Sequence, residues 1–361
     1  MNRILLTTAA GLLLASSCVR PAEERSKLDQ EVGKASLDDL SIEVENGQAA
    51  VQRISTERIT LWAQAPALQV KFSSESARDI TIELFNCMPT AELQIGQAVQ
   101  SPTSQPRPTH CIFDIGLPAG ESLVSIAPPD WQSEESFLFA DMGDIQTAMD
   151  SVDEIFDAIS AEPGVRFVMS TGDVVETGAP EEYELFLEKV THLDVPFFST
   201  IGNHELTEDI TRWHDLFGTL STHFRFKGVD FSYVDSGNAS LDPSLHSRLD
   251  RWLDEGKDRI HIFGTHYPLF DPVGVRNAGF RSRSEASKLL VQLARGQVDL
   301  TLYGHVHSLY KFENAGIPAF ISGGGGALPE RFDGIDRHFL LINPDPAEGR
   351  IVSIETRRIG N

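Results

Sequence analysis

The sequence is poor in cysteine, in basic residues and in long apolar runs. Of its 361 residues only three are cysteine, and 30 Lys and Arg stand against 53 Asp and Glu, which gives a formal net charge of -23. A chain this acidic repels polyanions, so long nucleic acid is disfavoured as a partner. The chain is nevertheless long enough, with 41% hydrophobic residues, for two domains that each bury a core.

The apolar run Ile4–Leu14 is too short to span a bilayer as a helix, and no other apolar run is as long as a transmembrane helix. It follows Met-Asn-Arg and precedes Ala15-Ser16-Ser17-Cys18, so residues 1–18 are predicted to be a signal peptide. Its end resembles the lipobox of bacterial lipoproteins, although Ala15 stands where Leu is usual, and this implies lipidation of Cys18. A plain secretory signal with an incidental cysteine is the alternative. We expect a location in the bacterial cell envelope, with membrane contact through the N-terminal lipid alone.

Residues 19–37 are polar and lack sustained periodicity, so we expect a flexible linker there. Residues 38–130 are predicted to form a separate, all-β, sandwich-like domain of antiparallel strands. The expected strands are Ala50–Ile54, Ile59–Ala63, Leu68–Phe72, Ile80–Phe85, Cys111–Ile115 and Ser122–Ile126.

Two cysteines flank the segment Ser101–His110, which has three prolines and is expected to be a loop. In an oxidising compartment Cys87 and Cys111 would form a disulfide, and two buried free thiols are the alternative.

Residues 131–361 alternate apolar, strand-like runs with amphipathic, helical ones, which is typical of an α/β domain. The expected strands are Phe137–Ala140, Arg166–Ser170, Pro196–Ile201, Phe231–Val234, Ile260–Gly264 and Leu300–Tyr303. The expected helices are Ile145–Ala161, Glu181–Leu193, Pro243–Glu255 and Ser284–Arg295.

Polar clusters follow five of these strand-like runs, at the carboxyl ends where open α/β sheets place their sites. The clusters are Asp141-Met142-Gly143-Asp144, Gly172-Asp173, Gly202-Asn203-His204-Glu205, Gly264-Thr265-His266 and Gly304-His305-Val306-His307. Carboxylate, amide and imidazole ligands suit borderline divalent metals, and one carboxylate can bridge two ions. No single strand end supplies enough ligands, but five strand ends at one edge do.

In this order the clusters resemble the calcineurin-like metallophosphoesterase superfamily over about residues 135–345, and the Gly-Asn-His-Glu and Gly-His-x-His clusters are specific to it. The resemblance implies a four-layer α/β/β/α fold and two transition metal ions, divalent or mixed-valence Mn, Fe or Zn. It implies that Asp173 bridges the metals and that His204 faces the phosphoryl oxygen or the leaving group. The implied ligands are Asp141, Asp173 and His307 for the first metal, and Asp173, Asn203, His266 and His305 for the second.

Two positions depart from the family pattern. Gly143 stands where most members have a metal-binding His, and the resulting Asp-x-Gly is similar to the purple acid phosphatase branch, which also has an N-terminal β domain. That branch has a Tyr three residues after the bridging Asp, where this chain has Glu176, so no Tyr-to-iron colour is expected. Glu176 is either a substitute carboxylate ligand or a solvated side chain. Asp144 is expected to be no more than a turn or helix-capping residue.

The expected function is that of an exported hydrolase of small phosphate monoesters or diesters. A hydroxide held between the metals would attack phosphorus, and His204 would assist the leaving oxygen. The alternative, suggested by Gly143, is a non-catalytic, metal-binding surface lipoprotein that binds an envelope component or partner. Arg276, Arg281 and Arg283 follow His266 in a long loop and are candidates to bind substrate phosphate, with a solvated role as the alternative.

Some features are expected to lie outside the chemistry. Gly323–Gly326 lacks the Lys-Ser/Thr of a phosphate loop and is predicted to be a tight turn near the metal edge. The histidines outside the motifs are expected to be surface or satisfied core residues; they are His192, His214, His223, His246, His261 and His338.

Overall fold

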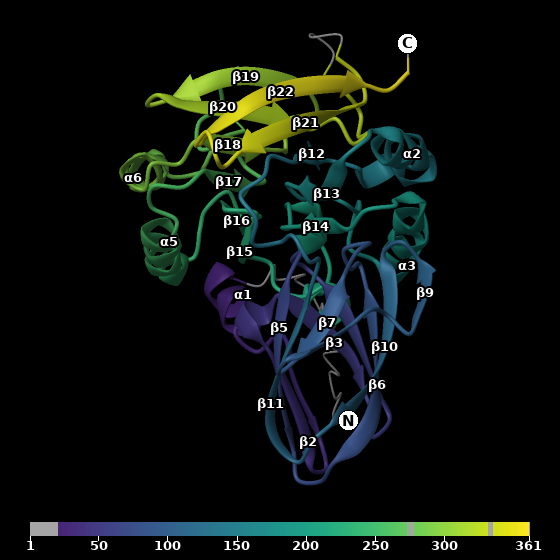
Figure 1. The fold of residues 1–361 in the computed structure, drawn as a ribbon. Coiled ribbons are helices and arrows are strands. Elements are labelled where there is room, and N and C mark those ends of the chain that lie inside the picture. Colours follow the sequence, from purple (N-terminus) through teal and green to yellow (C-terminus); the bar gives the residue numbers. More distant parts are fainter. Residues whose placement is uncertain (1–20, 273, 275–277, 331–334, 361) are drawn as a thin grey trace, which may run out of the picture.

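A computed structural model describes residues 21–272, 274, 278–330 and 335–360. Figure 1 shows a β-sandwich below a larger α/β domain, with the C-terminal strands at the far end from the sandwich. Cys18 and Arg276 lie outside the described residues, so their predicted roles stay predictions. Within the described part of the chain, none of the helices has the length and apolar character needed to cross a membrane.

The N-terminal domain consists of two sheets that enclose one hydrophobic core. The first has the order β1-β2-β5-β11-β7-β8 and the second β3-β4-β6-β10-β9. All neighbouring strands are antiparallel except β4 and β6, which run parallel. The strands are β1 Lys34–Leu37, β2 Leu40–Val44, β3 Ala49–Ile54, β4 Arg58–Ala63, β5 Leu68–Ser74, β6 Arg78–Phe85, β7 Glu92–Ile95, β8 Ala98–Gln100, β9 Ser104–Arg107, β10 His110–Leu117 and β11 Gly120–Ala127.

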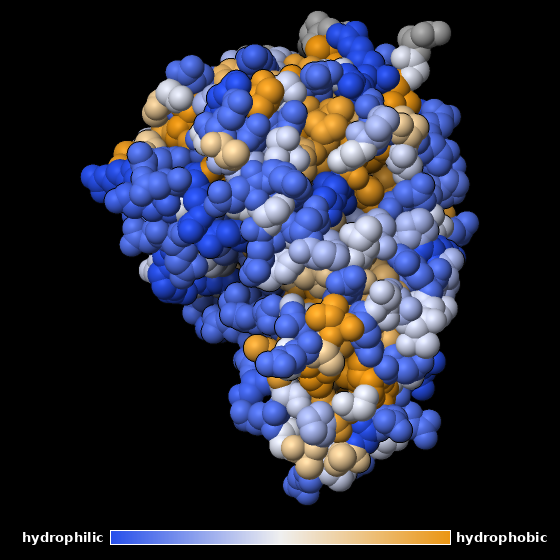
Figure 2. Space-filling view, viewed as in Figure 1, coloured by the Kyte–Doolittle hydropathy of each residue, from blue (hydrophilic) through white to orange (hydrophobic). Residues whose placement is uncertain are grey.

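The predicted sandwich and its six expected strands are confirmed, whereas the predicted loop at Ser101–His110 is wrong in part. Its central residues form the edge strand β9, in which Pro106 is tolerated because an edge strand leaves one side unpaired. Figure 2 shows hydrophobic residues gathered on part of the sandwich surface. Among the large hydrophobic side chains, Leu123 of β11 and Val99 of β8 are exposed. Cys87 and Cys111 are buried as free thiols with their sulfur atoms 2.7 Å apart, so their oxidation to a disulfide remains a prediction.

The expectation of a flexible linker is wrong for residues 21–37, which form helix α1 (Ala22–Asp29) and β1. Helix α1 lies beside α5 (Pro243–Glu255) of the other domain (Figure 1). Arg25 is completely buried and pairs with Asp235 through two hydrogen bonds of 2.8 and 3.0 Å. Asp29 accepts hydrogen bonds from the His214 ring and from the Leu220 and Ser221 amides. The segment is ordered by ionic contacts that its own sequence cannot reveal.

The α/β domain contains two sheets, with the orders β14-β13-β12-β21-β22 and β15-β16-β17-β18-β20-β19. Strands β12, β13 and β14 are parallel in the first sheet, as are β16, β17, β18 and β20 in the second. The strands are β12 Leu138–Met142, β13 Val165–Ser170, β14 Phe197–Ser199, β15 Thr222–Phe226, β16 Val229–Val234, β17 His261–Thr265, β18 Leu300–Tyr303, β19 Leu309–Asn314, β20 Ile317–Ser322, β21 His338–Asp345 and β22 Arg350–Arg358.

The helices cover the outer faces of both sheets, which confirms the expected four layers. Helices α2 and α3 pack on the first sheet, α5 and α6 pack on the second, and aromatic side chains such as Phe139, Phe167 and Phe231 fill the space between the sheets. The helices are α2 Asp153–Ala161, α3 Pro180–Lys189, α4 Thr211–Leu216, α5, and α6 Arg283–Arg295, with short 3-10 turns at Glu45–Gly47, Gln146–Ser151, Val190–His192 and His204–Leu206. The helix expected at Ile145–Ala161 is therefore split into a 3-10 turn and α2.

Candidate active site

The five polar clusters meet at one edge of the two sheets because each follows the carboxyl end of a strand. Asp141 lies at the end of β12, while the other four clusters follow β13, β14, β17 and β18. Four non-glycine residues here have a positive φ: Asp144, Gln146, Asp173 and His305. Such left-handed backbone is costly for residues with a side chain and gathers at functional sites, where surrounding contacts hold it.

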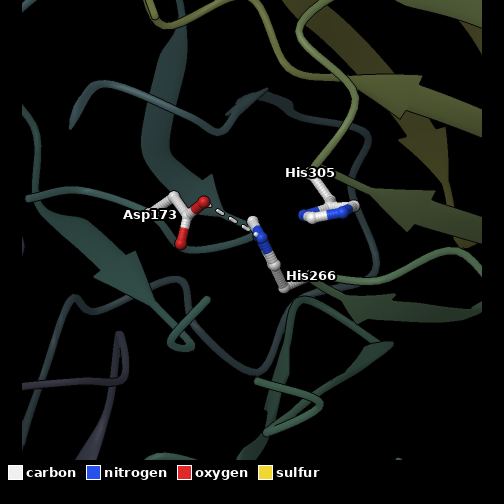
Figure 3. A group of neighbouring side chains, drawn as sticks. All are labelled: Asp173, His266 and His305. Atoms are coloured by element: carbon white, nitrogen blue, oxygen red, sulfur yellow. Dashed lines mark ion pairs between the residues drawn. The ribbon is translucent and has the colours of Figure 1, made fainter. Parts of the chain in front are cut away.

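Three of the predicted ligands form a compact group in which every candidate ligand atom lies within 4.8 Å of the others. Figure 3 shows Asp173, His266 and His305 pointing toward one another from three different strand ends. Asn203 joins them, with its Oδ1 3.1 Å from His266 Nε2 and 3.0 Å from His305 Nδ1. Atoms that bind one ion at 2.0–2.2 Å lie about 3 Å apart, so this donor set fits a transition metal.

A buried ion pair connects Asp173 and His266, whose Oδ2 and Nε2 atoms are 3.1 Å apart. Burial alone would raise the pKa of Asp173, but the charge and hydrogen bond of His266 outweigh it and lower that pKa. Burial would lower the pKa of His266, yet Asp173 raises it to about 9. His266 Nδ1 donates to the Thr171 carbonyl, which leaves Nε2 directed at the carboxylate. A positive charge is therefore favoured beside Asp173.

Asp141 is fully buried between the sheets and does not belong to that compact group. Its Oδ1 accepts a 2.9 Å hydrogen bond from the Tyr233 hydroxyl, while its Oδ2 has no hydrogen-bond partner among the described residues. Burial raises the pKa of Asp141 well above its usual range, and the Tyr233 hydrogen bond opposes this. A buried carboxylate oxygen without a donor is costly, and a bound cation would satisfy it.

The structure places His307 beside Asp144, a residue that the sequence analysis left outside the site. His307 Nδ1 donates to the Leu328 carbonyl, and Nε2 lies 3.6 Å from Asp144 Oδ1. Asp144 is completely buried, and its carboxylate accepts from the His305 amide. Burial raises the pKa of Asp144 to about 7, and His266 opposes the rise. The expectation of a mere capping residue is wrong, because Asp144 connects the first and last clusters.

His204 lies at the border between this site and solvent, with 27% of its side chain exposed. Its amide donates to Asp173 Oδ1, and its ring Nε2 lies 4.0 Å from Asp173 Oδ2. Its Nδ1 donates to the Glu176 backbone carbonyl at 2.6 Å and lies 3.5 Å from the Glu176 carboxylate. Burial would lower the pKa of His204, but Asp173 and Glu176 raise it. Glu176 therefore lies behind His204, outside the compact group of ligands.

Three side chains that the sequence analysis did not assign also shape the site. Gln146 donates to Asp173 Oδ2 at 2.7 Å. The ring of Tyr267 packs on His305 with centroids 3.9 Å apart. Burial raises the pKa of Glu205 to about 7, with Asp173 adding to the rise and the Gly202 amide opposing it. Glu205 and Tyr267 carried a sequence signal, since Glu205 ends the Gly202–Glu205 cluster and Tyr267 directly follows His266, whereas Gln146 carried none.

The glycines of the motifs are required by close approach. A Cβ atom at Gly202 would lie 2.1 Å from Asp173 Oδ1 and 2.7 Å from the His266 ring. A Cβ at Gly143 would lie 2.4 Å from Thr171 Oγ1, so any side chain at this position would require Thr171 to move. A Cβ at Gly325 would lie 2.5 Å from the Gly143 carbonyl, so Gly323–Gly326 approaches this edge closely, as expected.

The remaining candidates lie apart from the cluster. Arg281 and Arg283 are exposed just before and at the start of α6, and within the part of the chain that the structure describes no side-chain contact joins them to the ligands, so their role in substrate binding remains a prediction. His223 stacks on Trp252 at 5.0 Å, and burial lowers its pKa to about 3. His246 Nδ1 donates a hydrogen bond to the Gln292 side-chain oxygen at 2.9 Å. Both agree with the expected structural roles.

Comparison with known proteins identifies the second domain. The family model described as calcineurin-like phosphoesterase matches residues 138–309. The chain contains a calcineurin-like phosphoesterase domain. Its fold is also similar to that of the purple acid phosphatase PPD1 from yellow lupin (Lupinus luteus) seeds, with a TM-score of 0.54 at 12% identity over 81% of this chain and 72% of that one. This likeness shows a shared fold.

Two curated proteins are similar to the phosphoesterase domain. A probable glycerophosphodiester phosphodiesterase, GpdQ of Arcobacter nitrofigilis, is 28% identical over 159 residues, which cover 40% of this chain. The 3',5'-cyclic adenosine monophosphate phosphodiesterase CpdA of Pseudomonas aeruginosa is 26% identical over 192 residues, which cover 49% of this chain. The chain spans 58% of the length of the first and 68% of the second.

Proposed function

We propose that this chain is a metal-dependent hydrolase of small phosphodiesters. The observation that carries the proposal is the convergence of Asp173, Asn203, His266 and His305 beside the partly exposed His204. The two curated relatives are both named as phosphodiesterases, which supports diesters ahead of monoesters. The acidic chain favours small substrates over polynucleotides.

The donor set supports the second metal of the implied pair, held by Asp173, Asn203, His266 and His305. The first metal, which would complete a dinuclear centre, would draw on the bridging Asp173, on Asp141 with its unsatisfied Oδ2, and on His307. Imidazole mixed with oxygen ligands suits Mn, Fe or Zn. Such ions polarise phosphoryl oxygens and lower the pKa of water toward neutrality.

His204 is proposed to act on the leaving oxygen. Its Nδ1 is held by the Glu176 carbonyl, so the ring cannot turn freely and Nε2 stays on the side of Asp173. A partly exposed imidazole in that position can donate a proton to an oxygen that leaves phosphorus. Tyr267 packs on His305 and limits the movement of that ligand.

The test is hydrolysis of bis(4-nitrophenyl) phosphate and 4-nitrophenyl phosphate by protein stripped of metal and then supplied with Mn²⁺, Zn²⁺ or Fe²⁺. We expect no turnover without metal, recovery with at least one ion, and a preference for the diester. Turnover that survives complete metal removal would contradict the proposal. Metal binding without hydrolysis of either ester would favour a non-catalytic surface protein instead.

We also propose that the protein is exported and anchored through Cys18. Three residues separate Cys18 from α1, which begins at Ala22, so the lipid would lie within about 14 Å of the folded body at 3.3–3.6 Å per residue. The Cys18→Ala variant should therefore move from the membrane fraction to the soluble fraction. Retention in the membrane fraction would show that the anchor lies elsewhere.

A further inference from the structure

Glu205 is a buried carboxylate whose hydrogen bonds all go to the backbone of two ligand-bearing loops. Its side chain is 1% exposed. Oε1 accepts from the amides of Val174 at 2.6 Å and Val175 at 3.3 Å. Oε2 accepts from the amides of Gly202 at 2.7 Å and Asp173 at 3.2 Å. Among the described residues, no Lys or Arg forms an ion pair with Glu205, so these four amides, together with the nearby His266, stabilise its charged form.

Glu205 adds to two other bonds between these loops, which are the His204 amide to Asp173 Oδ1 and the His204 ring to the Glu176 carbonyl. The loops follow the neighbouring parallel strands β13 and β14, and their backbones touch where a Cβ at Gly172 would lie 2.3 Å from Gly202 N. One loop carries Asp173 in a left-handed conformation, which costs energy unless its surroundings hold it. The other carries Asn203 and His204 directly after Gly202. A fixed carboxylate between them sets the distance between their side chains.

We propose that Glu205 is a positioning residue for metal binding. It holds the amide of Asp173 and the residue before Asn203 against one carboxylate, so that the oxygens of both side chains face the same point. The inference rests on the proposed function only in assigning Asp173 and Asn203 as metal ligands. Hydrogen-bonding partners that orient metal ligands typically contribute a factor of 10–100 in metal affinity.

The test compares metal affinity in three purified variants by competition of Mn²⁺ or Co²⁺ with a chromophoric chelator. In Glu205→Gln the amide nitrogen faces two backbone donors in place of an acceptor, and the affinity should fall about 10–100-fold. Glu205→Asp keeps the charge with a shorter reach, so it should fold and bind metal with intermediate affinity. That variant keeps the test decisive if the Gln variant does not fold.

Glu182→Gln is the matched control. The Glu182 carboxylate accepts from the amides of Thr177, Gly178 and Ala179 at the start of α3, a similar set of bonds in the same loop that touches neither Asp173 nor Gly202. It should lower the urea midpoint while leaving metal affinity unchanged. Loss of stability without loss of metal affinity in both Glu205 variants would overturn the proposal. If the wild-type chain binds metal but hydrolyses no ester, the proposed function fails while this comparison of affinities still stands.

Discussion

Removal of the Arg25 guanidinium should destabilise the protein more than any exposed change in the same helix. Arg25→Met leaves the Asp235 carboxylate, 8% exposed, with its amide bond from Gly237 but without the cation that neutralises it. Breaking a buried pair by removing one partner typically costs 3–5 kcal/mol of unfolding free energy, so we expect a loss of about 3 kcal/mol or more. The matched change is Lys27→Met, because Lys27 pairs with Glu23 in the same helix but both side chains are about two-thirds exposed.

The assay is urea unfolding followed by tryptophan fluorescence at pH 7, with the slopes compared as well as the midpoints. Lys27→Met should leave the unfolding free energy almost unchanged, because an exposed i,i+4 pair contributes little to stability. Adding Asp235→Asn to Arg25→Met should recover part of the loss, since the buried charge is then gone. Equal midpoints for the Arg25 and Lys27 variants would refute the view that α1 is anchored by this pair.

Two further changes test the leaving-group and pH arguments. His204→Ala should reduce diester turnover by roughly 10²–10⁴-fold with little change in metal content, and less for nitrophenolate than for alkoxide leaving groups; equal losses for both would show that His204 orients the phosphoryl group instead. Arg166 and Lys227 lower the pKa of Asp130 in the folded protein below its ordinary value of 3.8. The ionised carboxylate therefore stabilises the folded state at pH values above about 4, and this contribution is lost as the pH falls and Asp130 becomes protonated. The Asp130→Asn variant should therefore have a lower urea midpoint than wild type at pH 7, and the gap should narrow below about pH 4. A gap that is constant with pH would exclude this ionic contribution.

Elements with local signals could be predicted from the sequence. At the start of helix α5, the Asp242 side chain accepts a hydrogen bond from the Ser244 amide and Pro243 is the first helical residue. The buried face of the helix follows from the spacing of Leu245 and Leu249, which lie about one turn apart. The ligand clusters could be predicted because glycine, carboxylate and imidazole follow apolar strands, and parallel strands end at one edge.

Features that depend on distant partners could not be predicted. Helix α1 has no apolar face, and Arg25 is held by a residue 210 positions away. Asp144 precedes a helical turn, as a capping residue would, and only the fold brings the His305 amide to its carboxylate from 161 positions away. The position of Glu176 behind His204 was equally hidden, because three residues of spacing do not fix the direction of a side chain.

The central claim is that Asp173 and its neighbours hold the metal on which phosphodiester hydrolysis depends. The most direct test measures bound metal per chain and bis(4-nitrophenyl) phosphate turnover on the same samples of wild type, Asp173→Asn and the control Asp153→Asn, whose carboxylate lies on the surface beside Lys189. We predict that Asp173→Asn loses both bound metal and turnover, while the control keeps both. The account would be contradicted if Asp173→Asn hydrolysed the diester as fast as wild type. It would also be contradicted if wild type bound metal but did not hydrolyse the diester.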